Sequence, residues 1–191
     1  MILRSQPQRQ ARHGLRRFSC CTLLLLLATG AVVNVSAAAL VPFGSVWKYL
    51  DDGSNQSNAW RSVDYEDGGW ASGPAQLGYG DGDEATEVSY GTNASAKFIT
   101  TYFRQTFDVP DPSGLTNLVL NLIRDDGAIV YLNGVEVFRS GMPAGAVIYT
   151  TRASENAENT PAGTNLSPAL LVVGQNLLVV EVHQDSQSSS D

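Results

Sequence analysis

Cysteine and histidine are scarce in this chain of 191 residues, which contains two of each. Both cysteines, Cys20 and Cys21, and one histidine, His13, lie within the first 38 residues. The absence of cysteine from the other residues, about 153, excludes a disulfide framework, a thiol nucleophile and a cysteine-ligated zinc or iron–sulfur site there. The single histidine that remains, His183, excludes a histidine-rich metal centre built by this chain alone.

The first 38 residues have the composition of a secretory leader. Five arginines and no acidic residue accompany an apolar run at 23–35, which small residues close at 36–39. This order of a basic region, a short apolar region and a small-residue cleavage motif is typical of a signal peptide. The apolar run is shorter than the roughly 20 residues of a membrane span. We therefore expect residues 1–38 to be a signal peptide that is cleaved near Ala38, and the protein to be secreted, either extracellular or periplasmic.

Basic residues are few after this leader. Seven basic and nineteen acidic residues remain, which gives a net charge of about −12. Such a charge argues against nucleic acid or an anionic membrane surface as a partner, and no later apolar stretch is long enough to span a bilayer. Residues 39–191 suffice for one domain with its own core.

Alternation of apolar and polar residues predicts β-strands throughout residues 39–191, whereas no helical period of useful length occurs. The clearest strand is expected over residues 97–109, with Phe103 and Phe107 on a buried face and Tyr102 and Arg104 on a solvated face. Further strands are expected at residues 46–50, 75–79, 115–123, 146–150, 169–173 and 176–184, and polar loops at 54–73, with one helical turn, and at 151–165.

A hairpin is predicted where Asn133-Gly134 separates two β-rich runs, residues 128–132 and 135–139. Both central residues of a type I′ turn need positive φ, and Asn-Gly satisfies this requirement. Several strands joined by turn-rich segments, without alternating helices, indicate an all-β fold of the β-sandwich or jelly-roll type.

Residues 39–191 contain an ordered set of short motifs that cover nearly the whole segment. The motifs are, in chain order, Trp47-Lys48-Tyr49-Leu50-Asp51-Asp52-Gly53; Trp60; Trp70 with Gly73; Leu77-Gly78-Tyr79-Gly80-Asp81-Gly82; Thr100-Thr101-Tyr102-Phe103-Arg104; Arg124-Asp125-Asp126-Gly127; Tyr131-Leu132-Asn133-Gly134; Gly174-Gln175-Asn176; and Glu181-Val182-His183-Gln184. This set resembles secreted bacterial accessory modules of the galactose-binding-like jelly-roll type. The resemblance implies a non-catalytic β-sandwich with a carbohydrate-binding role, often attached to a larger extracellular enzyme, and a structural calcium ion.

The C-terminal end departs from the pattern of those modules, which continue past a similar serine-rich stretch into another apolar strand. Here the sequence stops at Asp191 after the serines of residues 186–190. We expect a sheet that lacks its last strand and so has an open edge prone to pairing. Either the chain is a fragment of a longer product, which we favour, or a partner covers that edge.

Acidic residues gather in a glycine-containing loop that holds Asp81, Asp83 and Glu84. Calcium takes six to eight oxygen ligands, and nearby carboxylates on a loop can supply several of them. We therefore predict a structural Ca²⁺ site at this loop, with Asp51 and Asp52 as alternative or additional ligands. The alternative is a solvated acidic loop without an ion.

Six residues are candidates for contacting a ligand. Glu181 and His183 share one strand face because they lie two residues apart, and charged groups on such a face, with Arg104, could bind a hydroxyl-rich ligand. The alternative is a buried polar network that links strands. For the two aspartates before Gly127 the alternative is a role in the turn. The candidates are Tyr79, Arg104, Asp125, Asp126, Glu181 and His183.

These observations predict a non-catalytic module that binds carbohydrate or serves an attached catalytic or surface domain. No G-x-S-x-G motif accompanies the single histidine, so no catalytic triad is expected. A structural or adhesion module without a small ligand is the first alternative, and a fragment of a hydrolase is the second.

Overall fold

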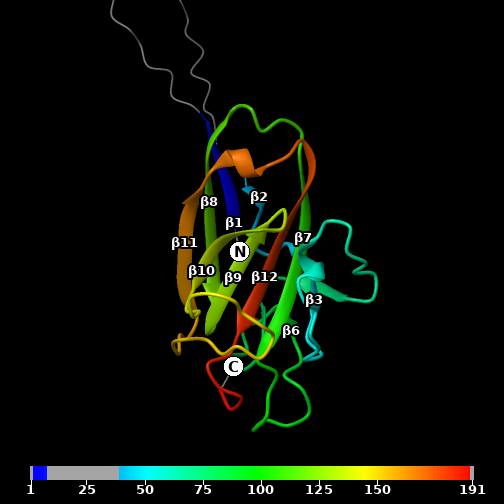
Figure 1. Ribbon diagram of the computed structural model, residues 1–191, viewed down its shortest axis with the longest axis vertical. Coiled ribbons are helices and arrows are strands. Elements are labelled where there is room, and N and C mark those ends of the chain that lie inside the picture. Colours follow the sequence, from blue (N-terminus) through cyan, green and yellow to red (C-terminus); the bar gives the residue numbers. More distant parts are fainter. Residues whose placement is uncertain (1, 8–38, 190–191) are drawn as a thin grey trace, which may run out of the picture.

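The computed structural model describes residues 2–7 and 39–189, which form an almost entirely β structure (Figure 1). Helical geometry in these residues is confined to two short 3₁₀ turns, η1 at Ala59–Arg61 and η2 at Pro168–Leu170. The strands are β1 (Ile2–Pro7), β2 (Ala39–Val41), β3 (Val46–Leu50), β4 (Ala71–Pro74), β5 (Leu77–Gly78), β6 (Thr86–Glu87), β7 (Thr100–Val109), β8 (Leu115–Arg124), β9 (Gly127–Leu132), β10 (Val135–Ser140), β11 (Thr160–Leu166) and β12 (Gly174–His183).

Two antiparallel sheets face each other. The larger has six strands in the order β10-β9-β12-β7-β3-β4, and the smaller has four in the order β11-β8-β1-β2. Strands β5 and β6 form a separate short parallel pair at one end. The expected all-β fold, a β-sandwich, is confirmed.

The main core lies between the two sheets. Leu118, Leu120 and Leu122 of β8 are buried there, as their alternation in the sequence predicts. Phe103 and Phe107 of β7 meet them from the larger sheet. The structure therefore confirms the strand expected at residues 115–123 and its buried leucine face. The strand expected at 97–109 begins at Thr100.

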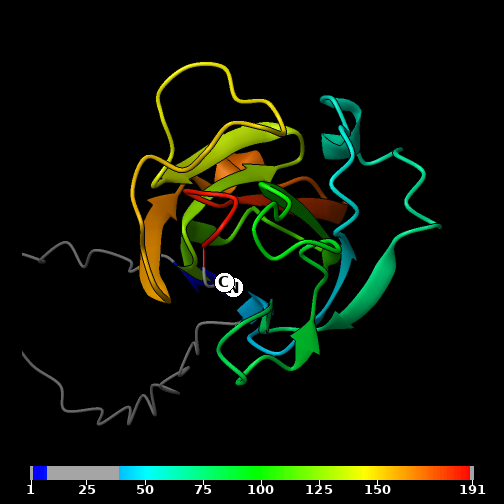
Figure 2. The same ribbon diagram turned by 90° about the horizontal axis from the view of Figure 1, so that it is seen from below.

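The outer face of the six-stranded sheet is also buried, contrary to the expected solvated face of β7. Tyr102 and Arg104 are each only 3% exposed. A second apolar cluster covers this face, formed with Trp60 of η1, Trp70 and Tyr149 from loops. Figure 2 shows the loop that follows β3 and the loop that follows β10 lying outside this sheet. These two long connections, expected to be polar loops apart from a strand at residues 146–150, therefore act as a third layer.

The hairpin at Asn133-Gly134 is confirmed. Both residues have positive φ, 51° and 82°, as a type I′ turn requires. The Asn133 side chain donates to Asn176 at 2.8 Å and accepts the backbone N–H of Leu177 at 2.9 Å. The turn is thus joined to the start of β12 as well as to its own strands.

Several local expectations were wrong. Residues 146–150 form no strand and instead contribute to the outer cluster, and residues 169–173 contain the end of η2 instead of a strand. The expected loop at 151–165 contains most of β11, because this polar segment pairs along β8. Of residues 75–79 only Leu77–Gly78 is a strand, and β4 lies just before it.

The N-terminal segment of the predicted leader forms strand β1. It lies between β8 and β2 and pairs antiparallel with both. Residues 8–38 of that leader, including the expected cleavage position, lie outside the described residues, as does Asp191, so cleavage and the missing last strand stay predictions. None of the described helical segments has the length and apolar character needed to cross a membrane.

Candidate functional site

A polar pocket opens at one end of the sandwich and brings together four of the predicted site residues. Tyr79, Asp81 and Glu84 reach it from the β5–β6 segment, and Asp125 reaches it from the turn after β8. Asn159, just before β11, completes its rim. The pocket has a volume of about 90 Å³. Segments that are far apart in the sequence therefore meet at one opening.

Hydrogen bonds order the rim of the polar pocket. The Asn159 side chain donates to Asp81 at 2.5 Å, and the Asn159 backbone N–H donates to Asp125 at 3.0 Å. Asn159 has a positive φ of 42°, a conformation that asparagine tolerates better than most residues. This residue thus holds two carboxylates in place, although no sequence motif identified it.

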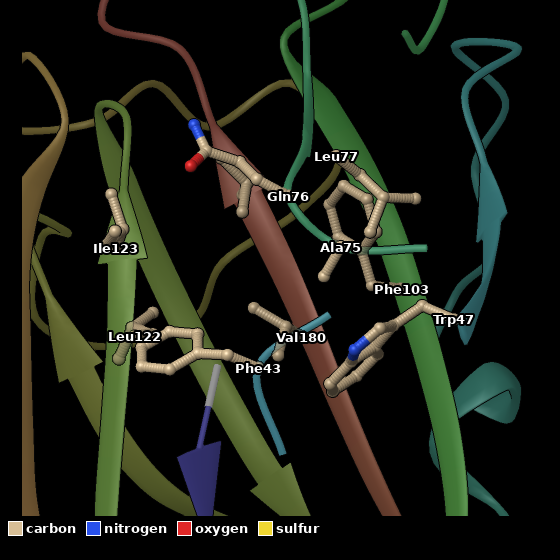
Figure 3. Close-up of a pocket in the computed structure, with 10 residues that line it drawn as sticks. Phe43, Trp47, Ala75, Gln76, Leu77, Phe103, Leu122, Ile123 and Val180 are labelled. Atoms are coloured by element: carbon tan, nitrogen blue, oxygen red, sulfur yellow. The ribbon is translucent and has the colours of Figure 1, made fainter. Parts of the chain in front are cut away.

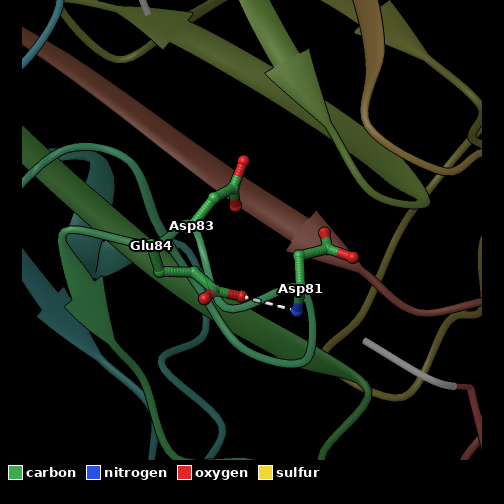
Figure 4. Close-up of side chains that lie close together, drawn as sticks. All are labelled: Asp81, Asp83 and Glu84. Carbon is green, nitrogen blue, oxygen red and sulfur yellow. Dashed lines mark hydrogen bonds between the residues drawn. The ribbon is translucent and has the colours of Figure 1, made fainter.

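The acidic loop forms a compact group of carboxylates. Ligand oxygens of Asp81, Asp83 and Glu84 lie within 4.8 Å of one another (Figure 4). Glu84 accepts the backbone N–H groups of Asp81 at 3.0 Å and Gly82 at 2.9 Å. Hydrogen bonds from backbone N–H groups, including its own, hold the pKa of Glu84 below its usual value. The donor set fits the oxygen preference of Ca²⁺, but all three carboxylates already accept hydrogen bonds within the protein, Asp83 from the Gln76 side chain at 3.5 Å.

Asp51 and Asp52 have roles in turns rather than in this group. Asp52 accepts the backbone N–H and the hydroxyl of Ser54, at 2.9 and 2.5 Å. Asp51 accepts the backbone N–H of Ser89 at 2.5 Å and so ties β3 to the segment after β6. Among the described residues, the carboxylate group that could hold an ion does not include either of them.

The two aspartates after β8 differ in their surroundings. Asp126 is fully buried and accepts backbone N–H groups from Ala157 and Asp185, each at 2.7 Å. Asp126 therefore joins the segment that contains Ala157 to the segment that follows β12. Asp125 lies at the polar pocket, so it is the aspartate of this pair that is placed to meet a ligand.

Glu181 lies in a buried polar network on the outer face of the six-stranded sheet. Its carboxylate accepts from Tyr131 at 2.6 Å and Arg61 at 3.2 Å, and lies 3.4 Å from the His183 ring. Burial alone would raise the pKa of Glu181. Hydrogen bonds from His183 and Tyr131 and the charge of Arg61 outweigh that effect and hold the pKa below its usual value.

The other members of this face bind loops to the sheet. Arg104 forms an ion pair with Asp67 at 2.8 Å and donates to the backbone carbonyls of Trp60 and Ser62. His183 is fully buried and its Nδ1 lies 2.7 Å from the carbonyl oxygen of Thr151. Arg104, Glu181 and His183 share one face as predicted, but they are not brought to the polar pocket. Their contacts are those of a network that links strands and loops.

An apolar pocket adjoins the polar one between the two sheets (Figure 3). Phe43, Trp47, Leu122 and Val180 line it, and its volume is about 120 Å³. The two pockets share several lining residues, so they form one groove with an apolar wall and a polar rim. The shared residues are Gln76, Leu77, Phe103, Ile123 and Val182.

Tyr79 is buried rather than available as a surface aromatic. It is 8% exposed, and its ring packs on Tyr90 with the centroids 5.1 Å apart. The Lys97 ammonium lies over the Tyr79 ring at 4.7 Å. Tyr79 therefore forms part of the wall of the polar pocket, with its ring already in contact with Tyr90 and Lys97.

No protein-family model matches the sequence, and no curated protein matches it. Among solved structures, β-glucuronidase 2 of Bacteroides uniformis is similar at 19% identity and a TM-score of 0.52, over 78% of this chain and 15% of that chain. A β-glucuronidase of Bifidobacterium dentium is similar at 18% identity and a TM-score of 0.50, over 74% of this chain and 19% of that one. The chain thus spans less than a fifth of these enzymes, and the likeness supports the β-sandwich fold.

Proposed function

We propose that this protein is a secreted, non-catalytic module of the galactose-binding-like jelly-roll type that binds carbohydrate next to an attached glycoside hydrolase. The observation that carries the proposal is the groove with an apolar wall and a rim of fixed carboxylate and amide groups. The partial likeness to glycoside hydrolases, in which a domain of this shape is a small part of a large chain, supports it.

The rim offers acceptors and donors that suit sugar hydroxyl groups. Asp81 and Asp125 are held by Asn159 in fixed positions, and a carboxylate that accepts from a hydroxyl makes a short, charge-assisted hydrogen bond. Gln76 and Gln184 add side-chain amides to the same pocket. Preorganised polar groups beside an apolar wall give a small-molecule site its orientation and specificity.

The charge of this rim favours neutral sugars. Asp81, Glu84 and Asp125 place three carboxylates at one opening, with Asp83 beside them, so their negative charge exceeds the charge of one bound Ca²⁺, and Arg124 is already paired with Glu155. A sugar that carries its own carboxylate would meet like charge at close range, which costs free energy in a partly desolvated site. We therefore propose neutral hydroxyl-rich glycans as the ligand class.

A structural calcium ion at Asp81, Asp83 and Glu84 is part of the proposal. Their oxygens already lie close enough to share one cation, and a bound ion would hold the β5–β6 segment at the pocket. The Asp81 carboxylate would then join the ion site to the sugar site, so calcium would raise the affinity for glycan.

A glycan array tests the proposal, with the protein probed in calcium and in chelator. We expect binding to neutral glycans that Asp125→Asn weakens at least tenfold, since the variant keeps the shape and removes the charge. Asp108→Asn is the matched control, because Asp108 is an exposed acid on β7 that does not line the polar pocket. If no glycan binds in either condition, the carbohydrate role is wrong and a structural or adhesion module remains. Turnover of glycosides by the purified protein would contradict the non-catalytic role.

A further inference from the structure

Gln184 is a buried polar side chain in the wall of the polar pocket. It directly follows the last residue of β12 and lines the pocket together with Val182, two residues earlier. Gln184 is only 8% exposed, and its side-chain oxygen Oε1 is buried without a hydrogen-bond partner in the part of the chain that the structure describes. Such an acceptor has lost its solvation without gaining a donor, which is rare in folded proteins.

The backbone around Gln184 is fixed on both sides. The Gln184 N–H donates to the carbonyl of Ile99 at 2.8 Å, and the Gln184 carbonyl accepts from the N–H of Ala153 at 3.0 Å. The next residue, Asp185, donates its N–H to Asp126 at 2.7 Å. The acceptor therefore belongs to a preorganised wall, as a group that sets ligand orientation should.

Several side-chain donors of the polar pocket are already used within the protein. All three guanidinium nitrogens of Arg124 donate to protein oxygens. The side-chain amide of Asn159 donates to Asp81, and that of Gln76 donates within the rim. Acceptors are therefore in excess at this pocket, and a ligand has to supply the donor for Gln184.

The remainder of the wall beside Gln184 is apolar. Val88, Phe103 and Val182 line the same pocket. A hydroxyl group placed there would donate to Gln184 but would keep lone pairs that need donors, whereas an amide N–H is a donor only. Sites that enclose a whole small ligand usually measure ~300–1,000 Å³. A pocket of about 90 Å³ therefore suits one substituent that combines an N–H with an apolar group.

We propose that the polar pocket takes the acetamido group of a neutral N-acetylamino sugar. The acetamido N–H donates to Gln184 Oε1, and its methyl group lies against Phe103 and Val182. The sugar ring then lies at the rim, where Asp81 and Asp125 accept from its hydroxyl groups. This inference rests on the proposed carbohydrate-binding function and names the sugar class. Gln184 is thus the residue that determines specificity.

Three methyl glycosides that differ only at carbon 2 test the inference on the whole chain in Ca²⁺. They carry an acetamido group, a hydroxyl group or an N-methylacetamido group, in a glucose series and a galactose series, and NMR titration gives each Kd. In at least one series we expect the acetamido compound to bind at least tenfold more tightly than the other two. The N-methylated compound keeps the apolar group but lacks the N–H, and a site built around an N–H rejects an analogue without it.

A substitution of the acceptor provides the second arm. Gln184→Met keeps the side-chain length and removes the oxygen, so it should abolish the preference and change the affinity for the hydroxyl compound less than twofold. Gln187→Met is the matched control at an exposed position outside both pockets, and melting curves verify that both variants are folded.

The outcomes separate this inference from the proposed function. Equal affinities for the three glycosides, or a preference that survives in folded Gln184→Met, would overturn the inference alone. The same holds if the chain binds glycans on the array but not the acetamido glycosides. If Gln184→Met does not fold, the comparison with the N-methylated compound decides. Absence of binding both on the array and in the titrations would overturn the carbohydrate role and this inference with it.

Discussion

Asp81 and Asn159, 78 positions apart in the chain, are joined by a side-chain hydrogen bond of 2.5 Å. The bond connects the β5–β6 segment to the residue that precedes β11. Through its backbone N–H, Asn159 also holds Asp125. The geometry of the polar pocket therefore depends on a residue that belongs to neither of the acidic motifs in the sequence.

Replacing Asn159 should separate ligand binding from stability. Asn159→Gly keeps the positive φ and removes the bond to Asp81, so we expect glycan affinity to fall about tenfold. The unfolding free energy should fall by only about 1 kcal/mol, since the lost bond is exposed. Asn165→Ala is the control, because it breaks a similar exposed amide pair with Asn117, outside both pockets. Equal loss of glycan binding in both variants would contradict this role.

Stability should fall in acid partly through Glu181. The pKa of this carboxyl is lowered in the folded state from its usual 4.5, so its contribution is fully present above about pH 4.5. That contribution is lost as the pH falls through the folded pKa. Glu181→Gln should cost about 3 kcal/mol at pH 7, because it leaves the Arg61 charge without its partner. Urea unfolding from pH 7 to pH 3 should show the unfolding free energies of the wild-type protein and of Glu181→Gln converging as the pH falls. A difference between the two that stays constant with pH would exclude this linkage.

Two substitutions at Asn133 should lower the free energy of unfolding by different amounts. Asn133→Gly keeps the positive φ but loses the bonds to Asn176 and Leu177, whereas Asn133→Ala also forces alanine into a strained conformation. We expect losses of about 1–2 kcal/mol for glycine and about 1 kcal/mol more for alanine. Denaturant unfolding would measure the order, and an equal loss in both variants would show that backbone conformation does not matter here.

Chelation should reveal the proposed calcium ion. If Ca²⁺ binds only the folded state, its removal lowers the melting temperature, and we expect a fall of several degrees in excess chelator. Asp83→Asn should abolish that response while changing the melting temperature in chelator very little. Asp108→Asn should retain the response. A melting curve that chelator leaves unchanged would contradict the proposed Ca²⁺ site.

The sequence predicted the parts of this fold that depend on neighbouring residues. Asn133-Gly134 fixes its own turn, and the leucines of β8 alternate with the period of a strand whose one face is buried. Strand β11 was missed because Thr160–Leu166 is polar and becomes a strand only by pairing along β8. Its structure comes from a partner that is distant in the sequence, which local patterns do not record.

The sequence predicted only part of the candidate site. The acidic loop and Asp125 were identified from their residue types, and they do meet at one pocket. Arg104, Glu181 and His183 were candidates for contacting a ligand on a solvated strand face, with a buried network that links strands as the alternative, and the structure shows that network. Here the loops after β3 and β10 cover that side, and the charges are bound to those loops instead.

Strand β12 is covered on both faces, and this determines which process follows proteolytic damage. Its backbone is paired on each side, with β7 and β9, so its amides should be among the last to exchange with solvent. Proteolytic removal of the long loop after β3 would leave these bonds intact and expose the apolar cluster that Trp60 completes. Damage to this protein should therefore lead to aggregation of a still folded sandwich sooner than to an unfolded chain.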